Sequence, residues 1–177
     1  MKKILILSAS PRKGGNSDML CDQFAKGAHD KGHQVEKLRL PEKKIGYCTG
    51  CGNCFDGKGC PQKDAMPEVL QKMVAAHAIV MATPVYFYAM NGQMKTLIDR
   101  TCARYREISG KEFYFIVTAA DGSKAAMQRT LKGFRGFTYC LDGAKEMGVL
   151  YGVGAWKAGD VAKTAAFQQA YAMGQAA

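Results

Sequence analysis

The sequence predicts a doubly wound α/β fold, in which helices cover both faces of one parallel sheet. The first observation is the order of the elements, because five short apolar runs alternate with stretches of helical periodicity along the 177 residues. The second is that the runs at 78–83 and 113–117 are apolar continuously rather than alternately, as strands buried on both faces are. The third is the composition, 47% hydrophobic and 23% charged, which is typical of a globular chain and favours a single domain over residues 1–177.

Each element follows from its local pattern. Strands are expected at 3–8, 34–40, 78–83, 113–118 and 149–154, with Pro84 ending the third. Helices are expected at 17–31, at 66–74 after a cap at Asp64, at 94–102, at 127–141, and from Asp160 to Tyr171. Pro67 fits the first turn of the second helix, where its missing N–H donor is tolerated.

The connections between these elements decide the topology. Right-handed crossovers between parallel strands place the helices on both sides of the sheet. Five βα units match the flavodoxin-like arrangement, a five-stranded parallel sheet with strand order 2-1-3-4-5, which binds ligands at the carboxyl ends around the switch between strands 1 and 3. The longest irregular stretch, at about 41–63, contains four cysteines and is expected to be an insertion in this domain.

Charge and targeting features exclude several classes of protein. The 25 Lys and Arg residues exceed the 15 Asp and Glu residues, and a net charge of +10 favours an anionic partner. These cations are spread along the chain without a nucleic-acid-binding motif, so no nucleic-acid partner is expected. No apolar run approaches the roughly 18 residues of a membrane span, and the run at 4–7 falls short of the roughly 7 to 15 residues of a secretory signal. We therefore expect a cytoplasmic chain with reduced thiols and no membrane partner.

The turn after the first strand reads SASPRKGGNS and leads directly into a helix. Hydroxyl and amide side chains at Ser10, Asn16 and Ser17, the cation of Arg12, a Gly-Gly pair and a helix N-terminus together suit a phosphate group. The turn matches neither the dinucleotide fingerprint nor the nucleotide-triphosphate loop. The alternative is a plain polar turn in which Ser17 is only a helix cap.

Two further loops are expected at the same edge of the sheet. The segment TPVYFYAMNGQMK follows the third strand, and its consecutive aromatic residues at 86–88 can wall a flat ring or pack on neighbouring helices or a second subunit. The segment TAADGS follows the fourth strand, where Asp121 and Gly122 suit the edge of a bound ring. The alternative there is a simple turn that leads to a helix cap at Ser123.

The clustered cysteines form a C-x2-C-x2-C-x5-C run at Cys48, Cys51, Cys54 and Cys60. Compact runs of this kind present the ligands of bacterial ferredoxin clusters. Zinc and unmetallated redox-active thiols remain as alternatives. The other three cysteines, Cys21, Cys102 and Cys140, fall at helical positions and are expected to be small core residues.

Taken together, these segments resemble the flavodoxin-like NADPH-dependent FMN reductases and, within them, the iron-sulfur flavoproteins. The resemblance rests on SASPRKGGNS, CTGCGNCFDGKGC and TPVYFYAMNGQMKTLIDR, and covers nearly the whole chain. It implies that FMN is bound, with its phosphate at Ser10, Arg12, Asn16 and Ser17. It also implies that the isoalloxazine ring lies against Pro84, Val85, Tyr86 and Phe87 and touches the loop Ala119, Asp121 and Gly122, and that the four clustered cysteines hold a 4Fe–4S centre. One departure is visible, because Ala65 stands where the family commonly has a second acidic residue after Asp64.

The resulting hypothesis is an FMN-dependent oxidoreductase that passes electrons between FMN and a cluster on the cysteine run. No hydrolytic set of side chains is present and none is needed, because the cofactor carries the chemistry. One alternative is an NAD(P)H-dependent FMN or quinone reductase without a cluster, and another is a zinc- or thiol-based sensing module without flavin. The expected partners are NAD(P)H or ferredoxin as donor and a quinone, a flavin or a similar small molecule as acceptor. A homodimer or homotetramer is also expected, with the aromatic residues 86–88 and Phe134 and Phe137 as surface for the partner.

Overall fold

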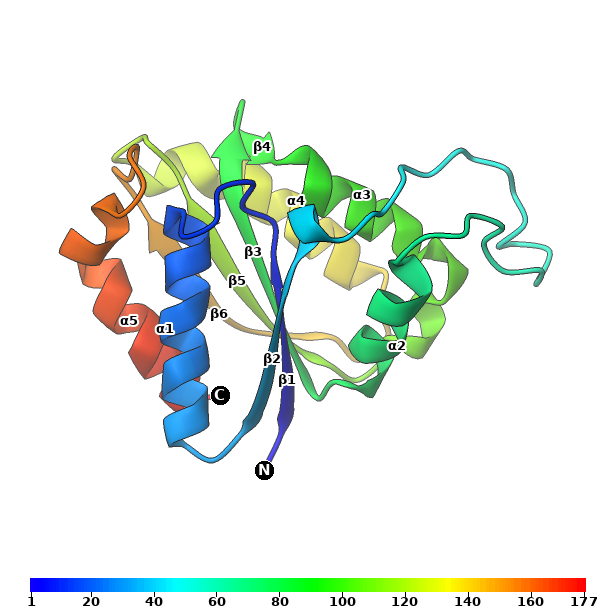
Figure 1. Cartoon of the computed structure of the whole chain (residues 1–177), viewed down its shortest axis with the longest axis horizontal. Helices are drawn as coiled ribbons and strands as arrows, with labels where there is room; N and C mark the ends of the chain where they lie inside the picture. The colour runs from blue at the N-terminus through cyan, green and yellow to red at the C-terminus, as the bar shows by residue number, and fades with distance from the viewer.

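The computed structural model describes residues 1–177 and consists of one parallel sheet between two layers of helices (Figure 1). The main strands are β1 (Lys3–Ser8), β2 (Gln34–Arg39), β3 (Ala78–Tyr86), β5 (Glu112–Thr118) and β6 (Lys145–Gly152). They lie in the order β2-β1-β3-β5-β6, and all neighbouring pairs are parallel. The predicted flavodoxin-like fold and its strand order are confirmed.

Helices cover both faces of the sheet, as the continuous apolar strands require. Helices α1 (Asn16–Asp30) and α5 (Ala165–Gln175) lie on one face, and α2 (Met66–Ala75), α3 (Gly92–Arg100) and α4 (Gln128–Tyr139) lie on the other (Figure 1). Successive β1 side chains alternate between the two cores: Ile6 packs with Phe24 of α1, and Leu7 packs with Met73 of α2. All five predicted helices are therefore present, and each buries one apolar side against the sheet.

The end of β3 differs from the prediction. The strand continues past Pro84 to Tyr86 and turns back into a sixth, two-residue strand, β4 (Ala89–Met90), which pairs antiparallel with it. Proline is tolerated here because β1 pairs with β3 only as far as Ala82, so this part of β3 has lost one neighbour and its unpaired side needs no N–H donor.

The last helix also begins later than predicted. Residues Asp160–Lys163 form a short 3-10 helix, η5, and α5 starts only at Ala165. The Asp160 carboxylate caps no α-helix, because its Oδ2 accepts hydrogen bonds from the backbone N–H groups of Trp156 (3.1 Å) and Lys157 (2.6 Å). Asp160 instead fixes the loop that follows β6.

Helices α1 and α5 touch backbone to backbone at Gly27 and Gly174. A Cβ on Gly27 would lie 2.1 Å from the carbonyl oxygen of Tyr171, and one on Gly174 would lie 2.1 Å from that of Phe24. Gly174→Ala is therefore expected to lower the free energy of unfolding by about 1 to 3 kcal/mol, because the two helices must separate. Gly136→Ala is the matched control, since a Cβ there meets nothing within 4 Å and alanine is the better helix former. Urea denaturation measures both, and equal stabilities of the two variants would contradict the close contact.

Two expectations about the exposure of residues can be compared with the structure. Cys21 is in the core as expected, but Cys102 is only partly buried and Cys140 is exposed, so the core assignment was wrong for these two. Phe134 and Phe137 are buried on the side of α4 that faces the sheet, so they cannot offer surface to a second subunit.

No helix has the length and apolar character to cross a membrane.

Candidate functional site

The loops after β1, β3, β5 and β6 meet at the carboxyl ends of the strands (Figure 1). A cavity of about 750 Å³ lies among these loops. Its lining residues are Arg12, Pro84, Val85, Tyr86, Phe87, Thr118, Ala119, Ala120, Ala155, Trp156, Lys157 and Ala158. Most of the lining is apolar, and the cations of Arg12 and Lys157 lie at its wall. A volume and lining of this kind are typical of pockets that bind cofactors.

The structure brings together only part of the predicted site. Arg12, Pro84, Val85, Tyr86, Phe87 and Ala119 line the cavity, whereas Ser10, Asn16, Ser17, Asp121 and Gly122 do not. The loop after β6, with Trp156 and Lys157, was missed. The topology itself was the available signal, because the last parallel strand ends at the same edge of the sheet as the others.

The first loop (residues 9–15) is held in a narrow turn that only glycine can complete. Ser10 Oγ donates to the Arg12 carbonyl (3.0 Å), and a Cβ on Gly15 would lie 2.7 Å from Ser10 Oγ. The Arg12 guanidinium donates across the cavity wall to the Trp156 carbonyl (3.2 Å). The loop therefore places one cation and the free N–H groups of the first turn of α1 beside the cavity.

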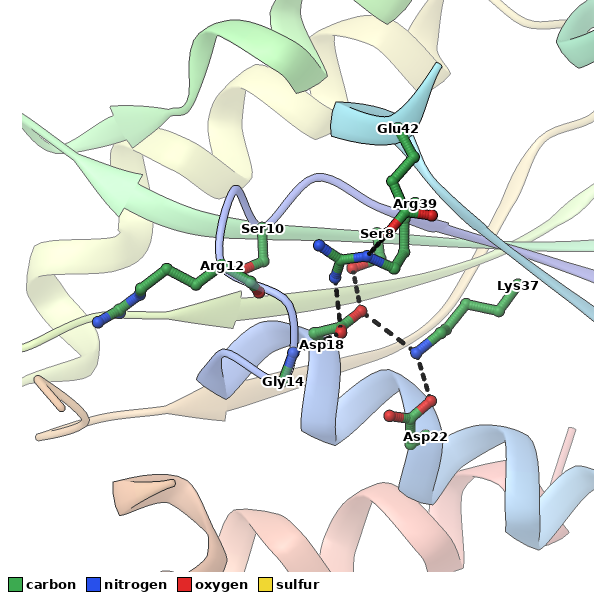
Figure 2. A network of polar contacts seen from close by, with 9 residues as sticks. All are labelled: Ser8, Ser10, Arg12, Gly14, Asp18, Asp22, Lys37, Arg39 and Glu42. Atoms are coloured by element: carbon green, nitrogen blue, oxygen red, sulfur yellow. Dashed lines mark hydrogen bonds and ion pairs between the residues drawn. The ribbon is translucent and has the colours of Figure 1, made fainter. Parts of the chain in front are cut away.

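A buried carboxylate supports this loop from below. Asp18 in the first turn of α1 is 2% exposed and accepts hydrogen bonds from Ser8 Oγ (2.9 Å) and from the Gly14 N–H (3.0 Å). Two cations of β2 also reach it, Lys37 at 3.2 Å and Arg39 at 2.6 Å, and they pair in addition with Asp22 and Glu42 (Figure 2). Figure 2 shows that Arg12 extends away from this network, so its charge is not used there.

The electrostatics of Asp18 follow from these partners. Burial alone would raise the pKa of its carboxyl group, but the hydrogen bonds from Gly14 and Ser8 and the charge of Lys37 outweigh burial and hold the pKa below its ordinary value. Asp18 is therefore ionised at neutral pH. Sequence reasoning missed this network, although the alternation of Lys37 and Arg39 on one face of the edge strand β2 was a signal for it.

The side chains of Asn16 and Ser17 contact the loop after β6 and the end of β5, and neither residue lines the cavity. The Asn16 amide donates to the carbonyls of Ala155 (3.0 Å) and Lys157 (2.9 Å) and accepts from the Val161 N–H (3.2 Å). Ser17 Oγ is 2.7 Å from Thr118 Oγ1 and buried. The alternative that Ser17 is a helix cap is wrong, because Gly15 occupies the cap position and Ser17 lies inside α1.

The β3–β4 hairpin projects two aromatic residues beside the cavity. Its turn residues Phe87 and Tyr88 have φ angles of 50° and 63°, which side chains other than glycine, asparagine and aspartate rarely adopt. Two-residue hairpins of this type require positive φ at both positions, so the turn geometry forces the strain. Phe87 is fully exposed. An exposed aromatic side chain in a strained turn gives no stability to the isolated subunit, which indicates a role in binding.

Phe87→Asn tests this reading of the turn. We expect the free energy of unfolding to rise by about 1 kcal/mol, since asparagine tolerates positive φ, while affinity for a flat aromatic ligand in the cavity falls. Phe87→Tyr is the control and should change neither. Thermal unfolding and flavin titration measure the two effects, and a destabilised Asn variant would show that Phe87 stabilises the fold.

The loop after β5 forms the simple turn that was the alternative for this segment. Asp121 Oδ1 accepts from the Ser123 N–H (2.7 Å), and Ser123 Oγ accepts from the Ala125 N–H (3.1 Å) at the start of the short helix η4 (Lys124–Met127). Asp121 thus points into the turn, away from the cavity. Only Ala119 and Ala120 of this loop line the cavity.

The cysteine segment (residues 48–60) is irregular and extends from the fold beside α2 and α3 (Figure 1). Cys48, Cys51, Cys54 and Cys60 all line one small cavity of about 70 Å³, and Cys102 from the end of α3 lines it too. No three Cys, His, Asp or Glu side chains are close enough to hold one metal ion together. Four thiols around one small cavity are the donor set that a thiolate-bound cluster requires. Because the thiols are too far apart to share one metal ion as they stand, binding of a cluster would have to draw them closer.

One buried guanidinium fastens both ends of the cysteine segment to α3. Arg100, with a side chain only 2% exposed, donates to the Gly46 carbonyl (2.6 Å) before the segment and pairs with Asp64 (2.6 Å) after it. It also donates to Gln62 Oε1 (2.9 Å) and to Cys60 Sγ (3.4 Å). Arg100 is therefore positioned to fix the return of the segment relative to the core.

Asp64 completes this clamp. Its carboxylate accepts from the Gly46 N–H (3.0 Å) and from the Met66 N–H (2.9 Å) at the start of α2. The cap position itself is occupied by Ala65, so the predicted cap at Asp64 was one residue too early. Burial raises the pKa of Asp64, but the hydrogen bonds from Arg100 and from the two backbone donors outweigh burial, so the net pKa lies below its ordinary value. Asp64 thus makes all of these contacts alone, and a second acidic residue in place of Ala65 is not needed for them.

Comparison with known proteins identifies the family. The family model described as NADPH-dependent FMN reductase matches residues 2–142. The chain belongs to this family. An iron-sulfur flavoprotein of Archaeoglobus fulgidus is 43% identical over 100 residues, which cover 56% of this chain and 45% of the relative. Another iron-sulfur flavoprotein of Archaeoglobus fulgidus is 31% identical over 135 residues, covering 72% of this chain and 69% of the relative.

Solved structures agree with the fold of this FMN reductase family member. An azoreductase from Bacillus anthracis str. Sterne superposes with a TM-score of 0.78 at 17% identity, and each chain is covered completely (100%). An NAD(P)H:quinone oxidoreductase from Methanothermobacter marburgensis superposes with a TM-score of 0.74 at 16% identity, covering 98% of this chain and 96% of that one. The chain spans about half the length of the first three curated relatives it matches, namely 45% of the first, 51% of the second and 48% of the third.

Proposed function

We propose that this chain is an FMN-dependent oxidoreductase that binds FMN in the cavity formed by the four loops. The observation that carries the proposal is this cavity of about 750 Å³ at the carboxyl ends of the sheet. Doubly wound sheets bind their ligands at this place, and the volume falls within the range of cofactor sites. Membership of the NADPH-dependent FMN reductase family supports the choice of FMN.

The chain's own residues would divide the work of binding. The Arg12 cation and the N–H groups of Asn16 and Ser17 in the first turn of α1 would hold the phosphate, with Ser10 and Gly15 shaping the loop. The flavin ring would contact Pro84, Val85, Tyr86 and Phe87, with Trp156 and Ala119 as further lining residues of the cavity. Bound FMN supplies redox chemistry in steps of one or two electrons, and the protein's part is to place it. Asp121 and Gly122 lie outside the cavity, and we assign them to the turn.

We propose further that the cysteine segment holds a 4Fe–4S cluster on Cys48, Cys51, Cys54 and Cys60 that exchanges electrons with FMN. The spacing of the donors, their common cavity and the Arg100 donor to Cys60 support it. The similar proteins named iron-sulfur flavoproteins support it too. Ferredoxin would suit such a centre as electron donor or acceptor. The cysteines must stay reduced to bind a cluster, and the cytoplasm is the compartment that keeps thiols reduced.

The second candidate is an NAD(P)H-dependent FMN or quinone reductase without a cluster. It is favoured by the separation of the cysteines, since no three of them converge on one metal position. The superposing quinone oxidoreductase supports it by name. In this case NAD(P)H would deliver hydride directly, the acceptor would be a quinone or a flavin, and the cysteine segment would be structural.

Anaerobic purification followed by flavin, iron and sulfide analysis decides among the candidates. A colourless chain without the absorption bands of oxidised flavin would overturn both and leave a zinc- or thiol-based module. A yellow chain with iron and sulfide that is bleached by ferredoxin or dithionite but not by NAD(P)H supports the first candidate. A yellow chain without iron that NAD(P)H bleaches supports the second.

We also propose a homodimer or homotetramer. Tyr86, Phe87, Tyr88 and Trp156 are all exposed around the mouth of the cavity, and a second subunit would cover them. Light scattering at micromolar concentration should give a mass above that of one chain. A monomer would contradict the proposal and leave these aromatic residues for the substrate.

A further inference from the structure

A fifth thiol lies beside the four clustered cysteines. Cys102 lies in the short helix η2 (Thr101–Ala103), directly after α3, and lines the same cavity as the four clustered cysteines. Cys54 and Cys102 are neighbours in this cavity, and after burial the charge of Cys102 is the largest cause that raises the pKa of Cys54. The cavity measures about 70 Å³. All five thiols therefore border one small space.

The position of Cys102 is set by the same clamp that holds the segment. Arg100, two residues earlier, donates to Cys60 Sγ and pairs with Asp64, so the end of α3 is fastened to the return of the segment. The clamp therefore fixes the return of the segment, at Cys60, beside the helix end that carries Cys102. Cys140 offers the contrast, because it is exposed and bonds only to the Gly136 carbonyl of its own helix.

We propose that Cys54 and Cys102 are a redox-active pair that forms an intrachain disulfide by exchange with a low-molecular-weight disulfide. One thiol attacks the small disulfide and releases one small thiol, giving a mixed disulfide on the protein. The second thiol then attacks that mixed disulfide and releases the other small thiol. The two protein thiols are oxidised, one small disulfide is reduced to two thiols, and no further electron acceptor is needed.

The disulfide and a metal centre on the segment exclude one another. A disulfide sulfur has no thiolate to donate, so Cys54 is lost as a ligand while the bridge persists. The bridge also ties the segment to α3. The effect on metal binding rests on the cluster part of the proposed function, whereas the disulfide itself does not.

The first test maps the bridge. The full chain, freed of metal by chelation, is incubated with oxidised glutathione, alkylated, digested and analysed by mass spectrometry. We expect the linked Cys54–Cys102 peptide to dominate and two of the seven cysteines to resist alkylation. Cys102→Ser should lose the linked peptide, and Cys140→Ser should keep it. A wild-type chain in which Cys102 stays alkylated, while Cys54 carries glutathione or pairs within the segment, would overturn the proposal.

The second test separates this inference from the cluster. Oxidised and re-reduced wild-type chains are reconstituted anaerobically with iron and sulfide. We expect the re-reduced chain to bind iron and the oxidised chain to bind at least fivefold less. Cys102→Ser should lose less iron binding on oxidation, because only a mixed disulfide with glutathione, and no intrachain bridge, can form on Cys54. Equal iron in both wild-type samples would overturn the exclusion. Iron in no sample, with the linked peptide present, would overturn the cluster and leave the disulfide established.

Discussion

Asp18→Asn is expected to lower the free energy of unfolding by about 3 kcal/mol at neutral pH, because it removes the one anion at the centre of a buried network. This loss lies at the lower end of the range of about 3 to 5 kcal/mol for breaking a buried ion pair, since Lys37 keeps Asp22 and Arg39 keeps Glu42 as a partner. One of the two carboxylate oxygens also becomes an NH2 group, so either the Gly14 N–H or the Ser8 hydroxyl loses its acceptor, and we expect flavin affinity to fall about tenfold. Urea denaturation and flavin titration measure the two effects.

Asp22→Asn is the matched control for this substitution. Asp22 pairs with the same Lys37, but its side chain is 56% exposed, and exposed pairs contribute less than about 1 kcal/mol. Equal losses in the two variants would show that surface charge, rather than the buried carboxylate, supports the first loop.

The pH dependence of stability gives an independent measure of Asp18. Its folded pKa lies below the ordinary value of 3.8, so the folded state binds a proton less readily than the unfolded state. The resulting stability is present above the unfolded pKa and is lost as the pH falls through the folded pKa. The wild type should therefore lose stability below about pH 4, and Asp18→Asn should lose less over the same interval. Parallel curves for the two proteins would exclude Asp18 as the titrating group.

Arg100→Met is expected to lower both the free energy of unfolding and the amount of iron that the cysteine segment binds. Methionine fills similar volume but cannot donate to Gly46, Gln62, Cys60 or Asp64, and Asp64 is left without its cation. Removing one partner of a buried pair costs about 3 to 5 kcal/mol. After anaerobic reconstitution we expect iron per chain to fall severalfold, while FMN, in a separate cavity, stays bound.

Two further variants sharpen the Arg100 experiment. Arg100→Lys keeps the charge without the planar fork of donors, so iron content should be intermediate. Arg104→Met removes an exposed arginine that pairs only with Glu107, and it should match the wild type. If Arg100→Met bound as much iron as Arg104→Met, the clamp would have no part in shaping the segment.

Periodicity was sufficient to predict the fold because the strongest signals were long. The continuous apolar runs of β3 and β5 and the spacing of α1 through α4 gave the sheet order and the layers. The ends of elements were harder to predict. By local pattern Pro84 predicts the end of the third strand and Asp160 predicts the start of the last helix. Tertiary contacts decide both, since β3 outlasts its neighbour β1 and Asp160 turns back to the loop at 156–157.

The candidate site was predicted in place but only partly in detail. Residue types showed that the loops at 8–17 and 84–88 carry binding chemistry, and the topology brings them together. The type of a side chain does not show where it points, however, and Asn16 and Ser17 turn toward neighbouring loops. Asp18, Arg100 and Cys102 were missed because each acts through residues far along the chain, at Arg39, Asp64 and Cys54.

The cysteine segment leaves and rejoins the fold at almost one point, because Gly46 bonds to both Asp64 and Arg100, and Ala65 N–H bonds to the Lys44 carbonyl. It is thus a closed excursion, and doubling the length of such a loop costs only about 0.6 kcal/mol. Chains with this architecture can consequently lengthen, shorten or exchange the excursion while the flavin-binding edge of the sheet stays intact. The cysteine segment and the loops around the large cavity are therefore free to evolve separately.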